Sequence, residues 1–307
     1  MNVLNLGDSF SDIGSERLES YLDFALRPLG LDPDNHATGA SYPHIREAFF
    51  EGNHHKSLGR SIQDVYDDPQ LDNDYVSFRQ SYEYCIRHQF MTRNYDVVTL
   101  FHAHNARNNL DAPVSRAIPF KVFATNRRFV LLDAGDISGM PDRLNVQIGG
   151  GDKLHGWIGQ IEKSPTGRFY RLASHDFPFK PFKNFNGIIT TYDMTTYKGS
   201  MSFLIDYIRY IDDLFWDGSV DIVLATVPSD YHQGAFDPRM SAVNAQVHEL
   251  VAEKSTKLFN LYSAMNITSQ SDHDQIFQGD GKHFFTIEER RDIAAPIFST
   301  FWQSQYP

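Results

Sequence analysis

Short continuous hydrophobic runs alternate along this chain with longer stretches in which hydrophobic residues recur at helical spacing. The short runs predict buried strands over residues 2–6, 96–101, 221–227 and 258–262. The helical spacing predicts helices over residues 15–27, 201–215, 240–254 and 286–302. Because strands and helices alternate, we expect an α/β fold with a mostly parallel sheet that helices cover on both faces.

The last predicted helix begins with a capping-box pattern and contains a proline. Thr286 and Glu289 have the spacing of a capping box, in which each side chain accepts a hydrogen bond from the backbone of the other residue. Pro296 lies inside the predicted helix, where a missing N–H group and a bulky ring favour a kink.

The segment 106–199 follows a different pattern. Turn residues at 149–151 and 164–167 separate runs with strand character at 128–132, 144–148, 154–161 and 168–172. We expect a β-rich insertion within one domain that spans residues 1–307. Its many aromatic residues favour a small satellite core, and a lid, a platform for stacking sugars or a dimer contact remain alternatives.

The composition narrows the choice of partners. The chain has 307 residues and a formal net charge of −11, so it repels phosphate backbones and nucleic acid is not expected as a partner. Cys85 is the single cysteine, which excludes an intramolecular disulfide and fits a reducing compartment. We see no signal peptide and no apolar run of the ~20 residues that span a bilayer, so we expect a cytoplasmic protein without membrane contact.

The first motif with chemical meaning directly follows the first predicted strand. The residues Gly7-Asp8-Ser9-Phe10-Ser11-Asp12 form a turn before a helix. A serine in such a turn lies at the carboxyl edge of the sheet, where backbone N–H groups point at a developing oxyanion. The alternative is that these residues only cap the helix.

The second motif, Asp280-Gly-Lys-His283, precedes the C-terminal helix. A serine hydroxyl needs a base to become a nucleophile, and histidine oriented by a carboxylate is the usual base. Asp280 and His283 are close enough in sequence for one loop to supply both groups. The alternative is a surface turn with a capping aspartate.

Together, the two motifs resemble the first and last blocks of the SGNH/GDSL hydrolases, in the same order along the chain. The segment 35–41 is similar to the family block whose glycine helps to bind the oxyanion, and the matching residue is Gly39. The segment 96–105 is similar to the strand that ends in Gly-x-Asn-Asp, which points to Asn105, although Ala103 and Ala106 replace the usual glycine and acidic residue. The resemblance covers residues 1 to about 105 and about 200 to 307.

The resemblance implies a three-layer α/β/α fold and an esterase that works through a serine ester. Ser9 would be the nucleophile, His283 its base and Asp280 the residue that orients His283. The N–H groups of Ser9 and Gly39 and the side chain of Asn105 would form the oxyanion hole. No cofactor is implied, and the expected substrate is an ester of a short acyl group such as acetyl, on a small molecule or a carbohydrate.

Two alternatives to a hydrolase stay open. An acyltransferase in polysaccharide or natural-product assembly would use the same residues. A catalytically inactive binding protein is the second alternative, which the altered Ala103 and Ala106 keep open, whereas the intact Ser9, Asp280 and His283 argue against it.

Four further polar residues are candidates for substrate binding: Asp8, His102, His104 and His232. Alternation along a strand-like run would place His102 and His104 on one face beside the site. Two histidines are too few for a zinc site, so no metal is expected. His232 follows the strand predicted at 221–227 and would lie at the same edge of the sheet. The oligomeric state stays open.

Overall fold

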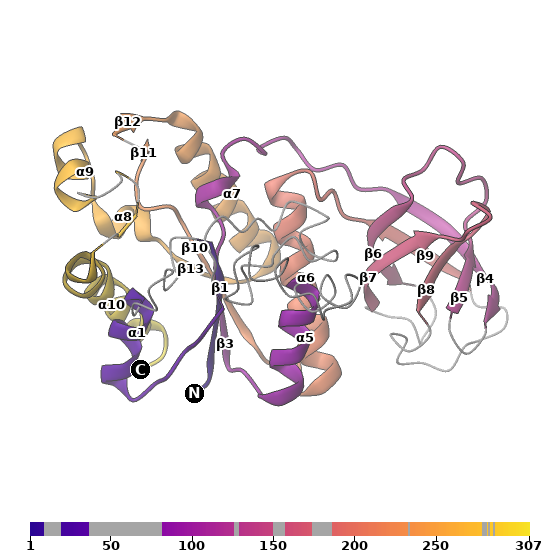
Figure 1. Ribbon diagram of the computed structural model, residues 1–307, viewed down its shortest axis with the longest axis horizontal. Helices are drawn as coiled ribbons and strands as arrows, with labels where there is room; N and C mark the ends of the chain where they lie inside the picture. The colour runs from indigo at the N-terminus through magenta and orange to yellow at the C-terminus, as the bar shows by residue number, and fades with distance from the viewer. Residues whose placement is uncertain are drawn as a thin grey trace, which may run out of the picture.

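The structure is a computed structural model that describes residues 1–8, 20–36, 82–125, 129–149, 157–173, 186–232, 234–277, 281, 283–284 and 286–307. Within this part of the chain, a parallel sheet flanked by helices lies beside an antiparallel barrel (Figure 1).

The main sheet contains five strands that are all parallel to their neighbours, in the order β13-β10-β3-β1-β2. The strands are β1 (Val3–Gly7), β2 (Asp34–Asn35), β3 (Val97–Phe101), β10 (Asp221–Ala225) and β13 (Lys257–Phe259). The parallel sheet predicted from the sequence is therefore confirmed. The strand predicted over 258–262 is wrong in its second half, because Asn260 caps a short helix, α8 (Leu261–Met265), by accepting a hydrogen bond from the backbone N–H of Ser263.

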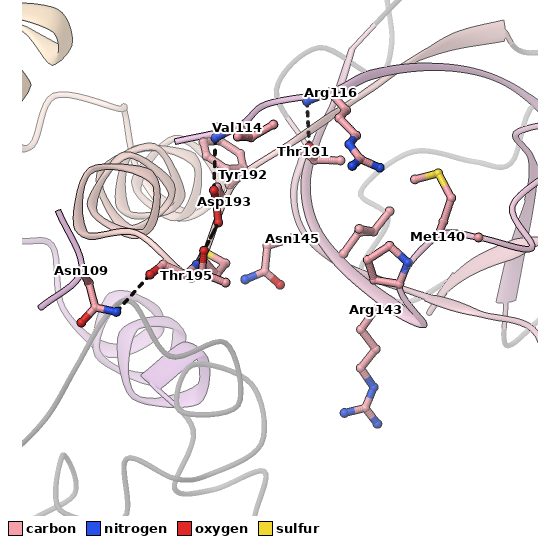
Figure 2. A pocket seen from close by; sticks show the side chains of 14 residues that line it. Asn109, Val114, Arg116, Met140, Arg143, Asn145, Thr191, Tyr192, Asp193 and Thr195 are labelled. Atoms are coloured by element: carbon pink, nitrogen blue, oxygen red, sulfur yellow. Dashed lines mark hydrogen bonds between the residues drawn. The ribbon is translucent and has the colours of Figure 1, made fainter. Parts of the chain in front are cut away.

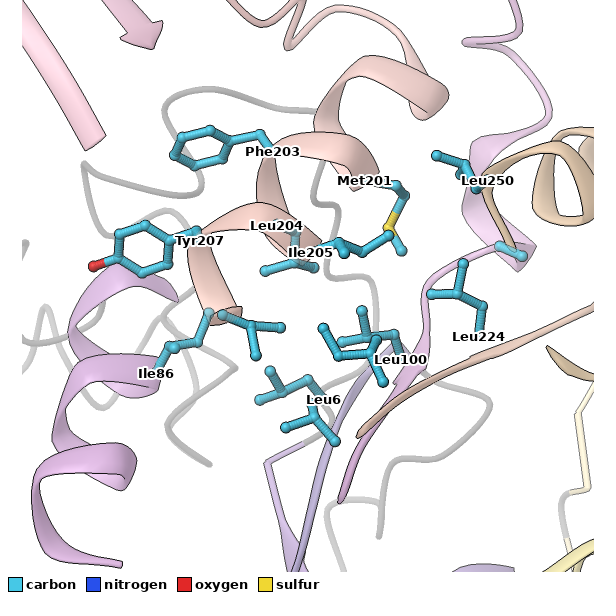
Figure 3. Close-up of a cluster of buried hydrophobic side chains, with 14 of the residues drawn as sticks. Leu6, Ile86, Leu100, Met201, Phe203, Leu204, Ile205, Tyr207, Leu224 and Leu250 are labelled. Atoms are coloured by element: carbon cyan, nitrogen blue, oxygen red, sulfur yellow. The ribbon is translucent and has the colours of Figure 1, made fainter. Parts of the chain in front are cut away.

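Helices lie on both faces of this sheet (Figure 1). One face packs on α5 (Tyr82–Thr92), α6 (Tyr197–Phe215) and α7 (Pro238–Lys254). The other packs on α1 (Tyr21–Leu26), α8 and α10 (Ala295–Gln305). Figure 3 shows the first of these cores, where Leu6, Leu100 and Leu224 of three adjacent strands meet side chains of α6. Since side chains alternate along a strand, Val3, Val97 and Val223 face the opposite core.

A row of polar side chains crosses the sheet inside the second core. Thr99 donates to the Asn5 side-chain oxygen at 2.7 Å, and Asn5 donates through Nδ2 to the side-chain oxygen of Asn35 at 2.8 Å. The three residues are direct neighbours in the registers of β3, β1 and β2. Asn5 and Thr99 are fully buried, so these bonds satisfy groups that would otherwise be costly to bury.

The C-terminal helix starts with the predicted capping box. Thr286 N–H donates to Glu289 Oε2 at 2.8 Å, and Glu289 N–H donates to Thr286 Oγ1 at 3.1 Å. A π-helical segment, η4 (Glu289–Ala294), then leads into α10. Pro296 is the second residue of α10, at the junction where the π-helical segment passes into the α-helix.

Short helical turns, a hairpin and a short helix connect the larger elements. The helical turn η1 (Arg27–Leu29) follows α1, and the turn η3 (His104–Ala106) follows β3. The strands β11 (Tyr231–His232) and β12 (Ala235–Phe236) form a small hairpin after β10, and α9 (Gln270–Ile276) follows α8. Among the helices described, none is long and apolar enough to cross a membrane.

The segment between η3 and α6 forms a closed barrel of antiparallel strands, in the order β4-β5-β8-β7-β6-β9. The strands are β4 (Ala117–Thr125), β5 (Phe129–Asp133), β6 (Arg143–Gly149), β7 (Trp157–Lys163), β8 (Tyr170–Ala173) and β9 (Asn186–Thr191). The predicted β-rich character is confirmed, although the sequence patterns did not identify β4 and β9. The barrel has its own buried core, which includes Leu132, Val146 and Ile161.

Candidate active site

The carboxyl ends of β1, β3 and β10 lie side by side at one edge of the main sheet. Asp8 follows β1 directly, and its N–H donates to the carbonyl of Phe101, the last residue of β3, at 2.9 Å. Ser9 is the next residue along the chain. Ser9, Gly39 and Asp280 lie outside the residues that the structure describes. Their assigned roles therefore stay predictions.

Asp8 lies completely buried at this edge. Asn105 donates through Nδ2 to Asp8 Oδ2 at 3.4 Å, so the predicted oxyanion residue and the neighbour of Ser9 are in contact. A carboxylate without exposed surface has little to offer a substrate directly. Asp8 is therefore placed to orient Asn105, and its role in substrate binding stays a prediction.

Two buried tyrosines flank Asp8, one from each helical layer. Burial raises the pKa of the Tyr21 hydroxyl well above its usual value, and the negative charge of Asp8 raises it further. The pKa of Tyr197, at the start of α6, is raised for the same two reasons in the same order. Neither tyrosine was predicted as a site residue, because a tyrosine in the first turn of an amphipathic helix is typical of an ordinary core.

Three histidines from distant parts of the chain meet beside this edge. The ring centroid of His104 lies 5.2 Å from that of His232 and 5.6 Å from that of His283. His104 belongs to η3, His232 to β11, and His283 to the loop before the C-terminal helix. The fold thus brings the predicted base, His283, to the edge at which β1 and β3 end.

Strand alternation was expected to place His102 and His104 on one face, and this expectation is wrong. The strand ends at Phe101 and His104 already lies in a helical turn, so strand alternation does not apply to this pair. Both side chains are nevertheless buried near the sheet edge, with exposed fractions of 1% and 4%. Turn formation after the strand, rather than strand pleating, directs His104 towards the other two histidines.

Several contacts fix the hairpin that carries His232. Ser229 accepts a hydrogen bond from Tyr231 N–H at 2.9 Å, and the rings of Tyr231 and Phe236 meet edge to face at 6.0 Å. Tyr262 donates to Asp230 Oδ2 at 2.8 Å, which ties the start of the hairpin to α8. These bonds hold the His232 backbone against the edge of the sheet.

A cavity of about 10 Å³ lies between the ends of the strands, and its lining includes Asp8, His104 and Thr226. This volume is close to that needed for one water molecule. Within the described residues, no group of three or more histidine, cysteine or acidic side chains is arranged to hold a metal ion.

No model of a known protein family matches this chain, and no curated protein matches it. Similar solved structures include a protein described as a GDSL-like lipase from Parabacteroides merdae. Its sequence is 11% identical, the match covers 99% of this chain and 94% of that chain, and the TM-score is 0.43. A lipase/acylhydrolase from Enterococcus faecalis has 12% identity, coverage of 99% and 97%, and a TM-score of 0.41. A peptidoglycan O-acetylesterase has 11% identity, coverage of 99% and 91%, and a TM-score of 0.35.

Proposed function

We propose that this protein is a serine ester hydrolase of the SGNH type with a three-layer α/β/α arrangement around its parallel sheet. Ser9 is the nucleophile, His283 is the general base and Asp280 orients the imidazole. The observation that carries the proposal is the position of His283, whose ring lies 5.6 Å from that of His104 at the end of β3. Asp8, the neighbour of Ser9 in sequence, ends the adjacent strand at the same edge.

The reaction then follows the two halves of acyl transfer through a serine ester. His283 takes the proton from Ser9 Oγ as this oxygen attacks the acyl carbon. The tetrahedral intermediate expels the alcohol, which receives the proton from His283. In the second half, His283 takes a proton from water, the resulting hydroxide attacks the acyl-enzyme, and the acid leaves as Ser9 Oγ is protonated again.

The oxyanion of each tetrahedral intermediate needs donors that are already in place. We assign this role to the N–H groups of Ser9 and Gly39 and to the amide of Asn105. The hydrogen bond from Asn105 to Asp8 uses one of the two hydrogens on Nδ2 and leaves the second for the oxyanion. The buried Asp8 carboxylate thus orients the Asn105 amide, which gives a reason for burying a charged residue next to the site.

For the substrate, we propose an ester of a short acyl group such as acetyl, carried by a carbohydrate. The altered residues Ala103 and Ala106 leave Asn105 itself in place, so they do not remove the predicted donor. Support for a carbohydrate comes from the barrel surface, where Phe123 stacks on Phe169 with ring centroids 4.4 Å apart. The Phe123 side chain is 59% exposed, and an exposed aromatic face of this kind can stack on a sugar ring.

The test compares two serines of the same turn. The Ser9→Ala variant should lose turnover of p-nitrophenyl acetate by about 10³-fold or more, together with labelling by a fluorophosphonate probe. The matched Ser11→Ala variant should keep both. If the wild type is neither labelled nor active, or if Ser9→Ala behaves like the wild type, the proposed nucleophile is wrong. Labelling at Ser9 without hydrolysis would instead favour transfer of the acyl group to an acceptor other than water.

A further inference from the structure

A second and much larger cavity lies where the barrel meets the helical layers of the main sheet (Figure 2). Its volume is about 860 Å³, within the range of cavities that bind small molecules. The lining comes from the loop between η3 and β4, from the start of β6 and from the segment that joins β9 to α6. It lies outside the cluster formed by Asp8, Asn105 and the three histidines, so the proposed ester chemistry does not account for it.

Asn145 is the more deeply buried of two buried polar residues in the cavity lining, the other being Thr191. It lies on β6 between Leu144 and Val146, whose side chains belong to the barrel core, so alternation turns Asn145 outwards. The side chain is nevertheless only 2% exposed, because the junction with the β9–α6 segment covers it. In Figure 2 it lies between Tyr192–Thr195 on one side and Met140 and Arg143 on the other.

The hydrogen bonds of Asn145 define which of its groups is left for a ligand. Its Oδ1 accepts from Nε2 of Gln160, the residue opposite on β7, at 3.0 Å. Its Nδ2 is buried and has no hydrogen-bond partner among the described residues. Buried amide hydrogens are nearly always satisfied, so this donor calls for an acceptor that enters the cavity.

The guanidinium of Arg116 gives the cavity lining a positive group for an anionic ligand. Arg116 and Arg143 line the cavity together with one carboxylate, Asp193. Arg143 lies 3.9 Å from Glu162, whereas no acidic side chain of the described residues lies within ion-pair distance of Arg116. Arg116 is thus the lining cation that an acidic ligand could pair with.

Asp193 keeps its negative charge, but its oxygens accept hydrogen bonds within the loop, and it forms no ion pair with Arg116. Oδ1 accepts from the N–H of Thr195 at 3.0 Å and from its hydroxyl at 2.6 Å, and Oδ2 accepts from Val114 N–H at 3.1 Å. Burial alone would raise the pKa of Asp193, but these hydrogen bonds outweigh it and lower the pKa. The side chain is therefore a fixed part of the wall and leaves Arg116 available.

We propose that this cavity binds an organic acid in which a carboxylate is attached to a ring-sized body. The carboxylate pairs with the planar guanidinium of Arg116, which suits two parallel hydrogen bonds. An oxygen of the ligand accepts from Asn145 Nδ2. The body lies against the apolar part of the lining, which includes Met140, Leu144 and Met194. Sugar acids and alicyclic or aromatic acids share this chemistry. The site does not depend on Ser9 or on the proposed hydrolysis.

The test is a direct binding titration of the intact protein by calorimetry or ligand-observed NMR. The probes are D-glucuronate, cyclohexanecarboxylate and uncharged D-glucose. We expect at least one carboxylate to bind, with an affinity that falls as salt is added, and D-glucose not to bind. Binding of D-glucuronate alone identifies a sugar-acid site, and equal binding of both acids identifies the carboxylate on a ring as sufficient. Failure of both acids to bind, or equal binding of D-glucose, would overturn the proposal.

Variants locate the site. Arg116→Gln should weaken carboxylate binding about 10–100-fold, the effect of losing a charge-assisted hydrogen-bond pair. Lys121→Gln removes one positive charge from an exposed position on β4, the strand that directly follows Arg116, outside the cavity lining, and should bind as the wild type does. Asn145→Asp keeps an acceptor for Gln160 but replaces the buried donor by a second carboxylate, and should also weaken binding. Because Arg116 is exposed, its variant tests the site even if Asn145→Asp proves unstable. Equal loss in Arg116→Gln and Lys121→Gln would show a general charge effect and contradict the proposed site.

Discussion

The strands at the centre of the main sheet are buried on both faces, whereas barrel strands such as β5 bury mainly one. Every residue of β1 and β3 is buried, while β5 alternates between half-buried and buried positions. The burial differs because helices cover both faces of the sheet, whereas the barrel encloses its core on its inner side.

This difference determines where each region can place polar groups. The sheet has no free face, so its candidate catalytic groups lie beyond the strand ends, in Asp8, Asn105, His104 and His283. The barrel has an outer face, and Asn145 points outwards from the middle of a strand into a cavity at the junction. We therefore assign the chemistry to the sheet edge and a separate binding site to the barrel wall.

The largest expected effect tests the sheet edge alone. His283→Ala should lower kcat for p-nitrophenyl acetate by about 10³–10⁴-fold, or about 4–5.5 kcal/mol in the barrier, because Ser9 loses its base. Carboxylate binding at the barrel should not change. His248→Ala is the matched control, since His248 is exposed on α7. Near-normal turnover in His283→Ala would remove the catalytic assignment from this edge.

The next effect compares the two cores. Leu100 of β3 and Leu132 of β5 are buried to the same degree, with exposed fractions of 1% and 0%, in separate hydrophobic clusters. Each Leu→Ala change should destabilise its region by about 3 kcal/mol, from lost burial and the cavity left behind. We expect Leu132→Ala to lower the midpoint at which urea abolishes carboxylate binding while esterase activity persists. Leu100→Ala should lower the midpoint for activity.

Urea titrations read out by activity, by carboxylate binding and by tryptophan fluorescence separate these outcomes. Trp157 lies in the barrel core and Trp302 in the core of the sheet, so fluorescence reports on both regions. If both variants lose activity and carboxylate binding at the same urea concentration, the two cores unfold as one unit. The separate assignment of activity to the sheet and of binding to the barrel would then be wrong.

The same contrast explains what the sequence could predict of the fold. Strands buried on both faces leave continuous hydrophobic runs, and such runs identified β1, β3 and β10 to within two residues. Barrel strands carry weaker patterns. β4 contains Pro119 and Lys121, and β9 begins with Asn186 and Gly187, so neither resembles an isolated strand. Their pairing with each other and with β5 and β6 is a long-range feature that local patterns do not contain.

The candidate site was predictable to the extent that it depends on strand ends. The carboxyl ends of parallel strands meet at one edge, which was enough to expect Asp8, Asn105 and His232 in one neighbourhood. The flanking Tyr21 and Tyr197 and the unsatisfied Asn145 were not predictable, because their meaning depends on what covers them. The assignments of Ser9, Gly39 and Asp280 stay predictions from the sequence.

The smallest expected effect comes from removing one of two threonine helix caps, one beside each candidate site. Thr196 caps α6 by accepting from Gly199 N–H at 3.1 Å, directly after the segment that lines the large cavity. Thr286 caps the C-terminal helix by accepting from Glu289 N–H at 3.1 Å, three residues after His283. Loss of either cap by a Thr→Ala change should lower the free energy of unfolding by about 1 kcal/mol.

The two variants should then differ in function. Thr196→Ala loosens the wall around Asp193 and should weaken carboxylate binding, with unchanged turnover of p-nitrophenyl acetate. Thr286→Ala loosens the segment that follows His283 and should lower kcat, with unchanged binding. The test measures kcat for p-nitrophenyl acetate and carboxylate affinity for both variants. Urea titrations check that both variants have lost the same free energy of unfolding. If either cap changed both functions equally, the two sites would be coupled through the helices, because α6 connects the cavity wall to Tyr197 beside Asp8.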